Sequence, residues 1–297
     1  MFRIVKLILF AGVIFLLYYQ VNSYEISEVH ISVSNWTAII VATLLVYPNI
    51  YCVYLIWKQS LVRSGIAFTG KQLNHSFFAG IVTGLLTPNM VGNFIGRVYY
   101  FDSKDRTVLT GLTLYGNHAH FVTSLLFGAV SLLFVDKSIW ESYFILLKWP
   151  LLFVILIGVL IYFFPEKIIP ASWTKWQINE LRSVLVSNKN LALLFLGYTG
   201  IRFLIFSTQF FLVLVAFGVA ADLKLYISIW LIYFITLSAP SLFLGKLGIK
   251  ESISIFVLST LGIDPLIVLV ASLYIWLLNT FSPALLGLFI TRERTSG

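Results

Sequence analysis

Arg202 is the residue whose position most clearly predicts chemistry. It lies in the middle third of a long apolar run, Leu191 to Val219. An arginine at the centre of a membrane-spanning helix costs about 2.5 to 3.5 kcal/mol, so it needs a partner. The candidates are Glu251, a phosphate-bearing lipid head group and helix-end carbonyls, and a functional role is favoured over pure structural pairing. Gln209 follows close to the same helical face.

Two proline-containing breaks interrupt apolar runs. Proline removes a backbone donor and disfavours helical geometry in the preceding residue. Each break therefore predicts two short helices that meet in a hairpin, which is tolerated within a membrane when it is buried in protein or lines a polar cavity. One Pro-kinked spanning helix is the alternative for the first break. The break residues are Pro88 and Asn89 in the first half and Pro240 and Ser241 in the second.

Charged residues follow both breaks. Arg97 comes after the first, and the adjacent pair Lys250 and Glu251 comes after the second. Hairpin helix ends carry partial charges that attract ions toward the bilayer midplane. We therefore expect these residues to contribute to an anion site, with snorkelling of Arg97 and Lys250 to the membrane interface as the alternative.

Polar residues also occur near the middle of the run from Thr107 to Val135. Asn117, His118 and His120 could form a polar lining or a proton-sensitive site. Residues at i and i+2 on a helix face apart, and no cysteine or acidic residue is nearby, so a metal site is not expected. Hydrogen bonding between helices is the favoured role for Asn117 and for Asn279.

Motifs for covalent or metal-dependent catalysis are absent from the sequence. There is no P-loop, GxSxG or HExxH sequence, and the single cysteine, Cys52, has no second thiol with which to pair. We therefore expect neither an enzyme nor a bound cofactor.

The composition indicates that the elements which position these residues are membrane helices. The 297 residues are 59% hydrophobic and include 20 Lys and Arg and 12 Asp and Glu, fewer than half the roughly 75 charges of an average soluble chain of this length. Mean hydropathy is +0.95. The sequence predicts an all-α polytopic membrane protein with residues 1–297 as one integral membrane domain. The net charge of +8 is interpreted through membrane topology rather than nucleic-acid binding.

The apolar runs predict about six full spans and two re-entrant hairpins. The second run, Trp36 to Trp57, is bracketed by tryptophans, which we expect to be interfacial anchors. A cleaved signal peptide is the alternative for the first run. Residues 165–190 contain an amphipathic pattern that predicts a helix lying on the cytoplasmic membrane surface. The predicted spans are Leu7 to Tyr19, Trp36 to Trp57, Thr107 to Val135, Tyr143 to Phe164, Leu191 to Val219 and Leu266 to Ile290.

The two halves share the order span, span, hairpin, span. Repeat 1 covers about residues 1–135 and repeat 2 about 143–290. Because the first half contains three full spans, an odd number, the second half begins on the opposite side of the membrane and has the opposite orientation. This predicts an inverted-topology repeat. Placing both termini in the cytoplasm assigns 14 of the 20 Lys and Arg residues to that side and four to the other, as the positive-inside rule requires.

The second hairpin resembles a known family. Pro240, Gly245, Gly248, Lys250 and Glu251, followed by the segments 261–263 and 282–287, resemble the signature of the lysylphosphatidylglycerol synthase transmembrane family, whose members include flippase-like membrane domains. The first hairpin, with Pro88, Gly92, Gly96 and Arg97, is similar to a second motif of that family. Asn93 stands where many relatives have a carboxylate. The cytosolic aminoacyl-transfer domain of bifunctional members is absent from this sequence.

The resemblance implies a flippase-like transporter that moves a polar-headed phospholipid or polyprenyl-linked lipid between leaflets. Arg97, Lys250 and Glu251 are the residues carried over by motif. The expected ligand is a membrane lipid with an anionic head group, and the expected location is the bacterial inner membrane. The alternative is a non-transporting partner that presents lipid to a separately encoded transferase or glycan-assembly enzyme.

Overall fold

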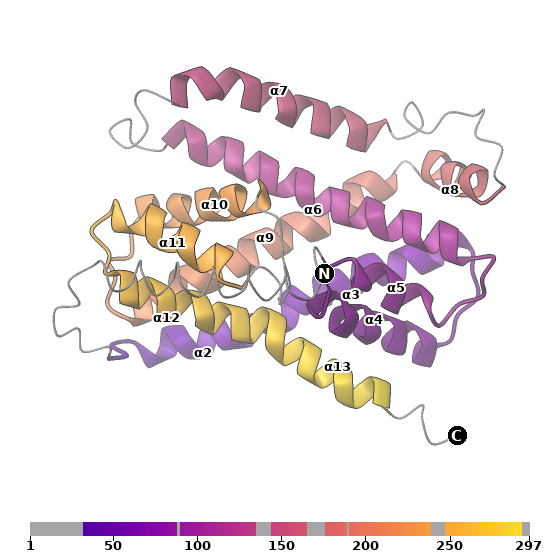
Figure 1. Ribbon diagram of the computed structural model, residues 1–297, viewed down its shortest axis with the longest axis horizontal. Coiled ribbons are helices and arrows are strands. Elements are labelled where there is room, and N and C mark those ends of the chain that lie inside the picture. Colours follow the sequence, from indigo (N-terminus) through magenta and orange to yellow (C-terminus); the bar gives the residue numbers. More distant parts are fainter. Residues whose placement is uncertain are drawn as a thin grey trace, which may run out of the picture.

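All regular secondary structure in the described part of the chain is helical (Figure 1). The computed structural model describes residues 32–87, 90–134, 144–164, 176–188, 190–238 and 247–292. The helices are α2 (Trp36–Leu44), α3 (Val46–Ser64), α4 (Gly70–Leu85), α5 (Gly92–Val98), α6 (Arg106–Phe134), α7 (Phe144–Phe163), α8 (Trp176–Ser187), α9 (Asn190–Ala216), α10 (Leu223–Ser238), α11 (Ile249–Ser259), α12 (Pro265–Trp276), the π-helix η5 (Leu277–Phe281) and α13 (Ser282–Arg292).

Four helical segments in the described residues are long and apolar enough to cross a membrane. They are Trp36–Ser64, Arg106–Phe134, Asn190–Ala216 and Pro265–Thr291, each of 27 or 29 residues. This exceeds the ~20 residues that a bilayer requires. The prediction of an all-α protein with membrane-length helices is confirmed. Two other spans were predicted. The one from Leu7 to Tyr19 lies outside the described residues. The one from Tyr143 to Phe164 corresponds to α7, whose apolar stretch Leu152–Phe163 is shorter than these four segments.

Large apolar side chains cover the outward faces of these helices. Tyr47 is 83% exposed, Leu133 67% and Phe289 64%. A water-soluble monomer rarely exposes large contiguous apolar patches. Their distribution over α3, α6 and α13 is typical of a protein whose outer surface is solvated by lipid.

Helices α4 and α5 form a tightly packed hairpin. The Thr87 hydroxyl accepts a hydrogen bond from the Gly92 amide at 2.6 Å, and the Thr83 hydroxyl donates to the Gly92 carbonyl at 2.6 Å. A Cβ on Gly96 would lie 2.5 Å from the carbonyl oxygen of Ala79. The glycines thus permit the close backbone approach that their spacing predicts. The predicted break residues Pro88 and Asn89 lie outside the described residues.

A second helical pair, α10 and α11, packs together in the other half of the chain. Helix α11 begins at Ile249 and is capped by Gly248, which adopts a positive φ of 87° that favours glycine. The Gly248 amide donates a 2.6 Å hydrogen bond to Glu251, three residues into the helix. This side-chain bond satisfies one of the free donors at the helix start. Pro240 and Ser241, the second predicted break, lie outside the described residues.

The helices of the two halves pack in a reciprocal pattern. Helix α6 packs along α10, where a Cβ on Gly128 would meet the ring of Phe234 at 2.3 Å. Helix α13 packs along α4, where a Cβ on Gly287 would lie 3.1 Å from the carbonyl oxygen of Phe78. Helices α3 and α9 also pack against each other. Figure 1 shows the α4–α5 and α10–α11 pairs toward opposite ends of the molecule.

The last long helix changes its winding in the middle. Asp264 caps α12 by accepting a hydrogen bond from the Leu266 amide at 2.7 Å, with Pro265 at the first helical position. The π-helix η5 then joins α12 to α13. Helix α12 contacts α9 and α11, whereas α13 contacts α4. One continuous segment therefore contacts α11 in one helical pair and α4 in the other.

Helix α8 bears out the helical part of the prediction for residues 165–190. Its apolar side chains Leu181, Val184 and Leu185 pack against a buried cluster that includes residues of α3 and α6. Leu181 fills the space beside Gly111 of α6, where a Cβ would approach it to 2.2 Å. The apolar face of α8 is thus directed at the protein.

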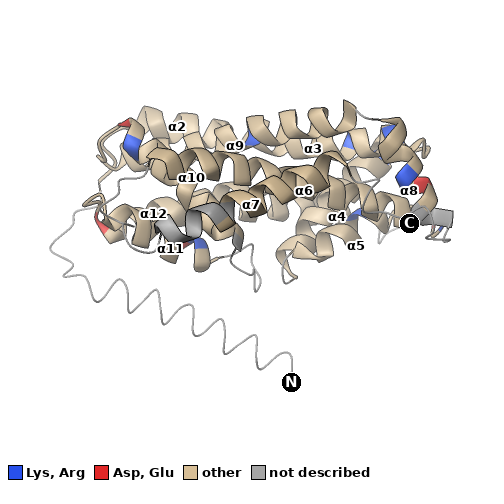
Figure 2. Cartoon of the chain, turned by 90° about the horizontal axis from the view of Figure 1, so that it is seen from above, with Lys and Arg blue, Asp and Glu red and all other residues tan. Residues whose placement is uncertain are grey.

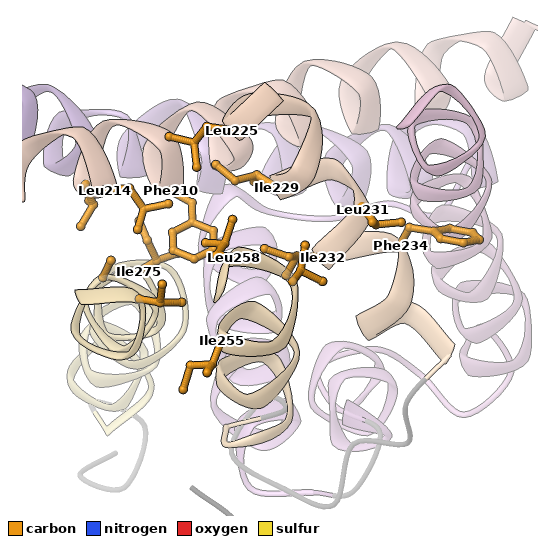
Figure 3. Packing of buried hydrophobic residues seen from close by; sticks show 14 of the residues in the cluster. Phe210, Leu214, Leu225, Ile229, Leu231, Ile232, Phe234, Ile255, Leu258 and Ile275 are labelled. Carbon is orange, nitrogen blue, oxygen red and sulfur yellow. The ribbon is translucent and has the colours of Figure 1, made fainter. Parts of the chain in front are cut away.

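The largest buried cluster lies where α9, α10, α11 and α12 meet (Figure 3). Phe210 stands at its centre and is fully buried, with Leu258 and Ile275 packed near it from the other helices. Each fully buried side chain of this size contributes about 1.5 to 3 kcal/mol in transfer free energy from water. This packing fixes the second helical pair against the long helices.

Candidate functional site

Few charged residues lie in the interior of the described structure. Figure 2 shows most charged positions toward the two ends of the elongated molecule, with a few basic positions between them. Arg97 is 3% exposed and Glu251 is fully buried, whereas Arg202 and Lys250 are partly accessible. These residues sit on α5, α9 and α11, so three separate elements bring charge into the apolar core.

Arg202 is bound by two neutral side chains. Its Nε donates a 3.1 Å hydrogen bond to Oδ1 of Asn49 on α3, and its Nη1 lies 3.4 Å from Nε2 of His120 on α6. Because a guanidinium only donates, the imidazole nitrogen is the acceptor in this contact. The Arg202 Cζ also lies 5.7 Å from the centroid of the Phe206 ring. The sequence-based candidates did not include these partners, which the packing of α3 and α6 on α9 supplies.

A chain of amides continues from Asn49 through the core. Asn49 donates to Oδ1 of Asn279 at 2.5 Å, and Asn279 donates to Oε1 of Gln209 at 2.9 Å. Gln209 donates in turn to the carbonyl of Ala42 at 2.9 Å. Asn279 lies in the π-helix, and π turns are frequent at functional sites. The predicted interhelical role of Asn279 is confirmed, and Gln209 serves in the same chain.

Arg97 is enclosed by aromatic rings. Its Cζ lies 5.2 Å from the Trp57 ring centroid and 5.8 Å from that of Phe77. Its Nε is buried without a hydrogen-bond partner, as is Oδ1 of Asn93 one helical turn earlier. A Cβ on Gly80 would lie 2.6 Å from the Arg97 side chain and 2.9 Å from the Asn93 oxygen, so the glycine makes room for both.

The prediction that Trp57 is an interfacial anchor is wrong. Its side chain is fully buried, and its indole nitrogen donates a 2.9 Å hydrogen bond to the hydroxyl of Ser76 on α4. The helix α3 continues past Trp57 to Ser64, so this position lies inside the protein. Trp36, at the other end of the segment, is 66% exposed.

The interior charges influence one another across the helices. Arg97 and Arg202 both contact α3, at Trp57 and Asn49 respectively, and the charge of Arg202 acts on Arg97. The charges of both Arg202 and Glu251 act on Tyr233, whose hydroxyl donates a 3.5 Å hydrogen bond to the carbonyl of Phe206.

Lys250 and Glu251 are linked through Ser272 of α12. Lys250 donates to the Ser272 carbonyl at 3.2 Å, and the Ser272 hydroxyl donates to Oε1 of Glu251 at 3.1 Å. The Lys250 Nζ also lies 5.5 Å from the Phe210 ring centroid. Because Glu251 also caps α11 through Gly248, this carboxylate has a structural role in addition to balancing charge.

The polar residues near the middle of α6 do not form one site. Asn117 is exposed and makes no hydrogen bond with the described residues. His118 faces Tyr162 of α7, with ring centroids 5.5 Å apart, whereas His120 faces Arg202. Within the described ranges, no group of three or more His, Cys, Asp or Glu side chains is placed to hold a metal ion.

Asn49 is the site residue that sequence reasoning missed. It is 3% exposed and joins Arg202 to Asn279. A lone amide in the apolar run from Trp36 to Trp57 was the available signal, because polar side chains in such runs often bond to neighbouring helices. Ser272 was missed for a different reason, since serine occurs at many positions in this chain.

Comparisons with known proteins give no match: no family model, curated protein or solved structure is significantly similar to this chain.

Proposed function

We propose that the chain is a flippase-like transporter that moves a lipid with an anionic head group between leaflets. The buried Arg97 carries this proposal. The residue is 3% exposed, its Nε is buried without a partner, and its side chain makes no hydrogen bond or ion pair with the residues that the structure describes. A buried unpaired charge is strongly unfavourable, and an anionic ligand would compensate it.

Arg202 supports the same role. Its partners Asn49 and His120 are neutral, so they orient the guanidinium without cancelling its charge. The side chain is also partly accessible. An arginine fixed in this way retains donors for a phosphate oxygen, and planar guanidinium groups match phosphate geometry well.

The proposed transport route uses an inverted repeat of six spans with two re-entrant hairpins. The reciprocal packing of α6 on α10 and of α13 on α4 supports this arrangement, as do the matching glycine contacts at Gly128 and Gly287. In inverted repeats, one half can rock against the other around a site near the bilayer midplane. Arg97, Arg202 and Lys250 would then be reached alternately from each leaflet.

We also propose that the protein is in the bacterial inner membrane with both termini in the cytoplasm. The supporting observation is the uneven distribution of Lys and Arg over the predicted loops. Membership of the lysylphosphatidylglycerol synthase transmembrane family belongs to the same proposal and rests on the motifs around Arg97 and Lys250.

The test is transport of fluorescent anionic lipid by the purified full-length protein in vesicles. We expect the wild type to accelerate transfer between leaflets and Arg97→Gln to slow it at least tenfold, since a charge-assisted hydrogen bond contributes about 1.5 to 3 kcal/mol. Lys58→Gln is the matched control, because Lys58 is exposed on α3 and its replacement removes the same charge.

Equal rates for wild type and Arg97→Gln would refute the site assignment. A wild type that binds the lipid but leaves transfer at the rate of empty vesicles would refute transport. That second result would favour the alternative role, in which the chain presents lipid to a separately encoded transferase or glycan-assembly enzyme.

A further inference from the structure

We infer that the head group bound by this protein is a dianionic phosphate, as in a phosphomonoester or diphosphate lipid, and that it lies between Arg97 and Arg202. This inference rests on the proposed function and names the class of lipid. It follows from the balance of charges in the described interior and from the hydrogen-bonding capacity left on the two arginines.

The interior of the described structure carries an excess of positive charge. Arg97, Arg202 and Lys250 are cationic, and Glu251 is the carboxylate buried with them. Lys250 and Glu251 share Ser272 and balance one another. Two positive charges, those of Arg97 and Arg202, are therefore left without an acidic partner among the described residues.

Those two charges are placed to act on one ligand. Both guanidinium groups contact α3, Arg97 at the Trp57 ring and Arg202 at Asn49, and the charge of Arg202 acts on Arg97, so the groups repel each other in the absence of an anion. An anion between them would replace this repulsion with two attractions. A single negative charge would leave one arginine unbalanced, and a zwitterionic head group would leave both, whereas a dianion balances both.

The free donors on the arginines also fit a phosphate. Arg97 has a buried Nε without a partner. Arg202 uses Nε for Asn49 and Nη1 for His120, and its remaining terminal nitrogen makes no hydrogen bond with the described residues. A phosphate monoester has three oxygens that accept hydrogen bonds from several directions, so it can bind both guanidinium groups together.

The experiment measures binding of two lipids to the full-length protein in nanodiscs of zwitterionic lipid at pH 8. Phosphatidic acid is the dianionic probe, and phosphatidylglycerol with the same acyl chains is the monoanionic probe. We expect the wild type to bind phosphatidic acid at least tenfold more tightly. Inorganic phosphate is the competitor that separates a lipid ligand from a free one.

The variants Arg97→Gln and Arg202→Gln each remove one charge, so we expect the preference for the dianion to fall toward parity in both. Lys58→Gln should retain the wild-type preference. The comparison of the two lipids on the wild type requires no variant, so a misfolded variant leaves the test intact. Displacement of lipid by an equal concentration of inorganic phosphate would assign the same dianionic site to free phosphate.

Equal binding of both lipids by the wild type would overturn the inference. If transport in vesicles is observed with no preference for the dianion, the proposed function stands and the inference fails. If the dianion is preferred but no lipid is transported, the inference about the head group stands and the transport proposal fails.

Discussion

Replacing Gly96 by alanine tests how closely α4 and α5 approach each other. An added Cβ would lie 2.3 Å from the Thr83 hydroxyl oxygen, 2.5 Å from the Ala79 carbonyl oxygen and 2.6 Å from the Ala79 carbonyl carbon. A carbon normally lies at least about 3.3 Å from a carbonyl oxygen, so the helices would have to separate by roughly 0.8 Å. The atoms that block the Cβ include backbone, which a rotamer change cannot move.

The expected cost follows from two opposing contributions. Overpacking in a well-packed site destabilises by about 1 to 3 kcal/mol, while alanine in place of glycine in a helix stabilises by about 1 kcal/mol. Separation of the helices also stretches the 2.6 Å hydrogen bond between Thr83 and the Gly92 carbonyl, which contributes about 1 kcal/mol. We expect Gly96→Ala to lower the free energy of unfolding by about 1 to 3 kcal/mol.

The assay is thermal unfolding of the purified protein in detergent, followed by circular dichroism and by the loss of monodisperse protein. Gly197→Ala is the matched control, because Gly197 lies in α9 and a Cβ there has nothing within 4 Å. We expect Gly197→Ala to raise the unfolding midpoint or leave it unchanged and Gly96→Ala to lower it. The same increase for both variants would refute the close approach of α4 and α5.

Three further predictions concern the buried polar groups. Glu251→Gln should lower the free energy of unfolding by about 1 to 3 kcal/mol in thermal unfolding, because it weakens the helix cap and leaves Lys250 unbalanced; an unchanged midpoint would contradict this. Asn279→Leu should destabilise by about 1 kcal/mol in the same assay, since Asn49 and Gln209 each lose a hydrogen bond; a gain in stability would argue against the amide chain. Cys52 is 7% exposed, so a membrane-permeant maleimide should label it far more slowly than it labels unfolded protein, and equally fast labelling would contradict its burial.

The sequence predicted the elements better than their contacts. The long runs around Arg202 and His120 appear as α9 and α6, because about 20 apolar residues in a row leave little choice of structure. The spacing of Gly92 and Gly96 predicted a close helix contact, and the structure has it. Each of these predictions depends on residues that are near one another in the chain.

Contacts between distant residues were outside the reach of such reasoning. The partners of Arg202 lie 153 and 82 residues away in the chain, and the face that Asn49 presents is set by how α3 packs on α9. The π turn around Asn279 has no composition cue in an otherwise ordinary apolar run. Trp57 shows the opposite error, because a tryptophan near a run end predicts an interface unless the protein itself covers that position.

The π-helix η5 sets the relative phase of the two ends of one long segment. Each residue turns an α-helix by about 100°, so a wider turn between Trp276 and Ser282 rotates the face that α13 presents relative to α12. Regular α winding through the same residues would turn Gly287 away from α4 while α12 kept its contacts with α11. The five residues of the π-helix therefore fix the angle between the face of α12 that contacts α11 and the face of α13 that contacts α4.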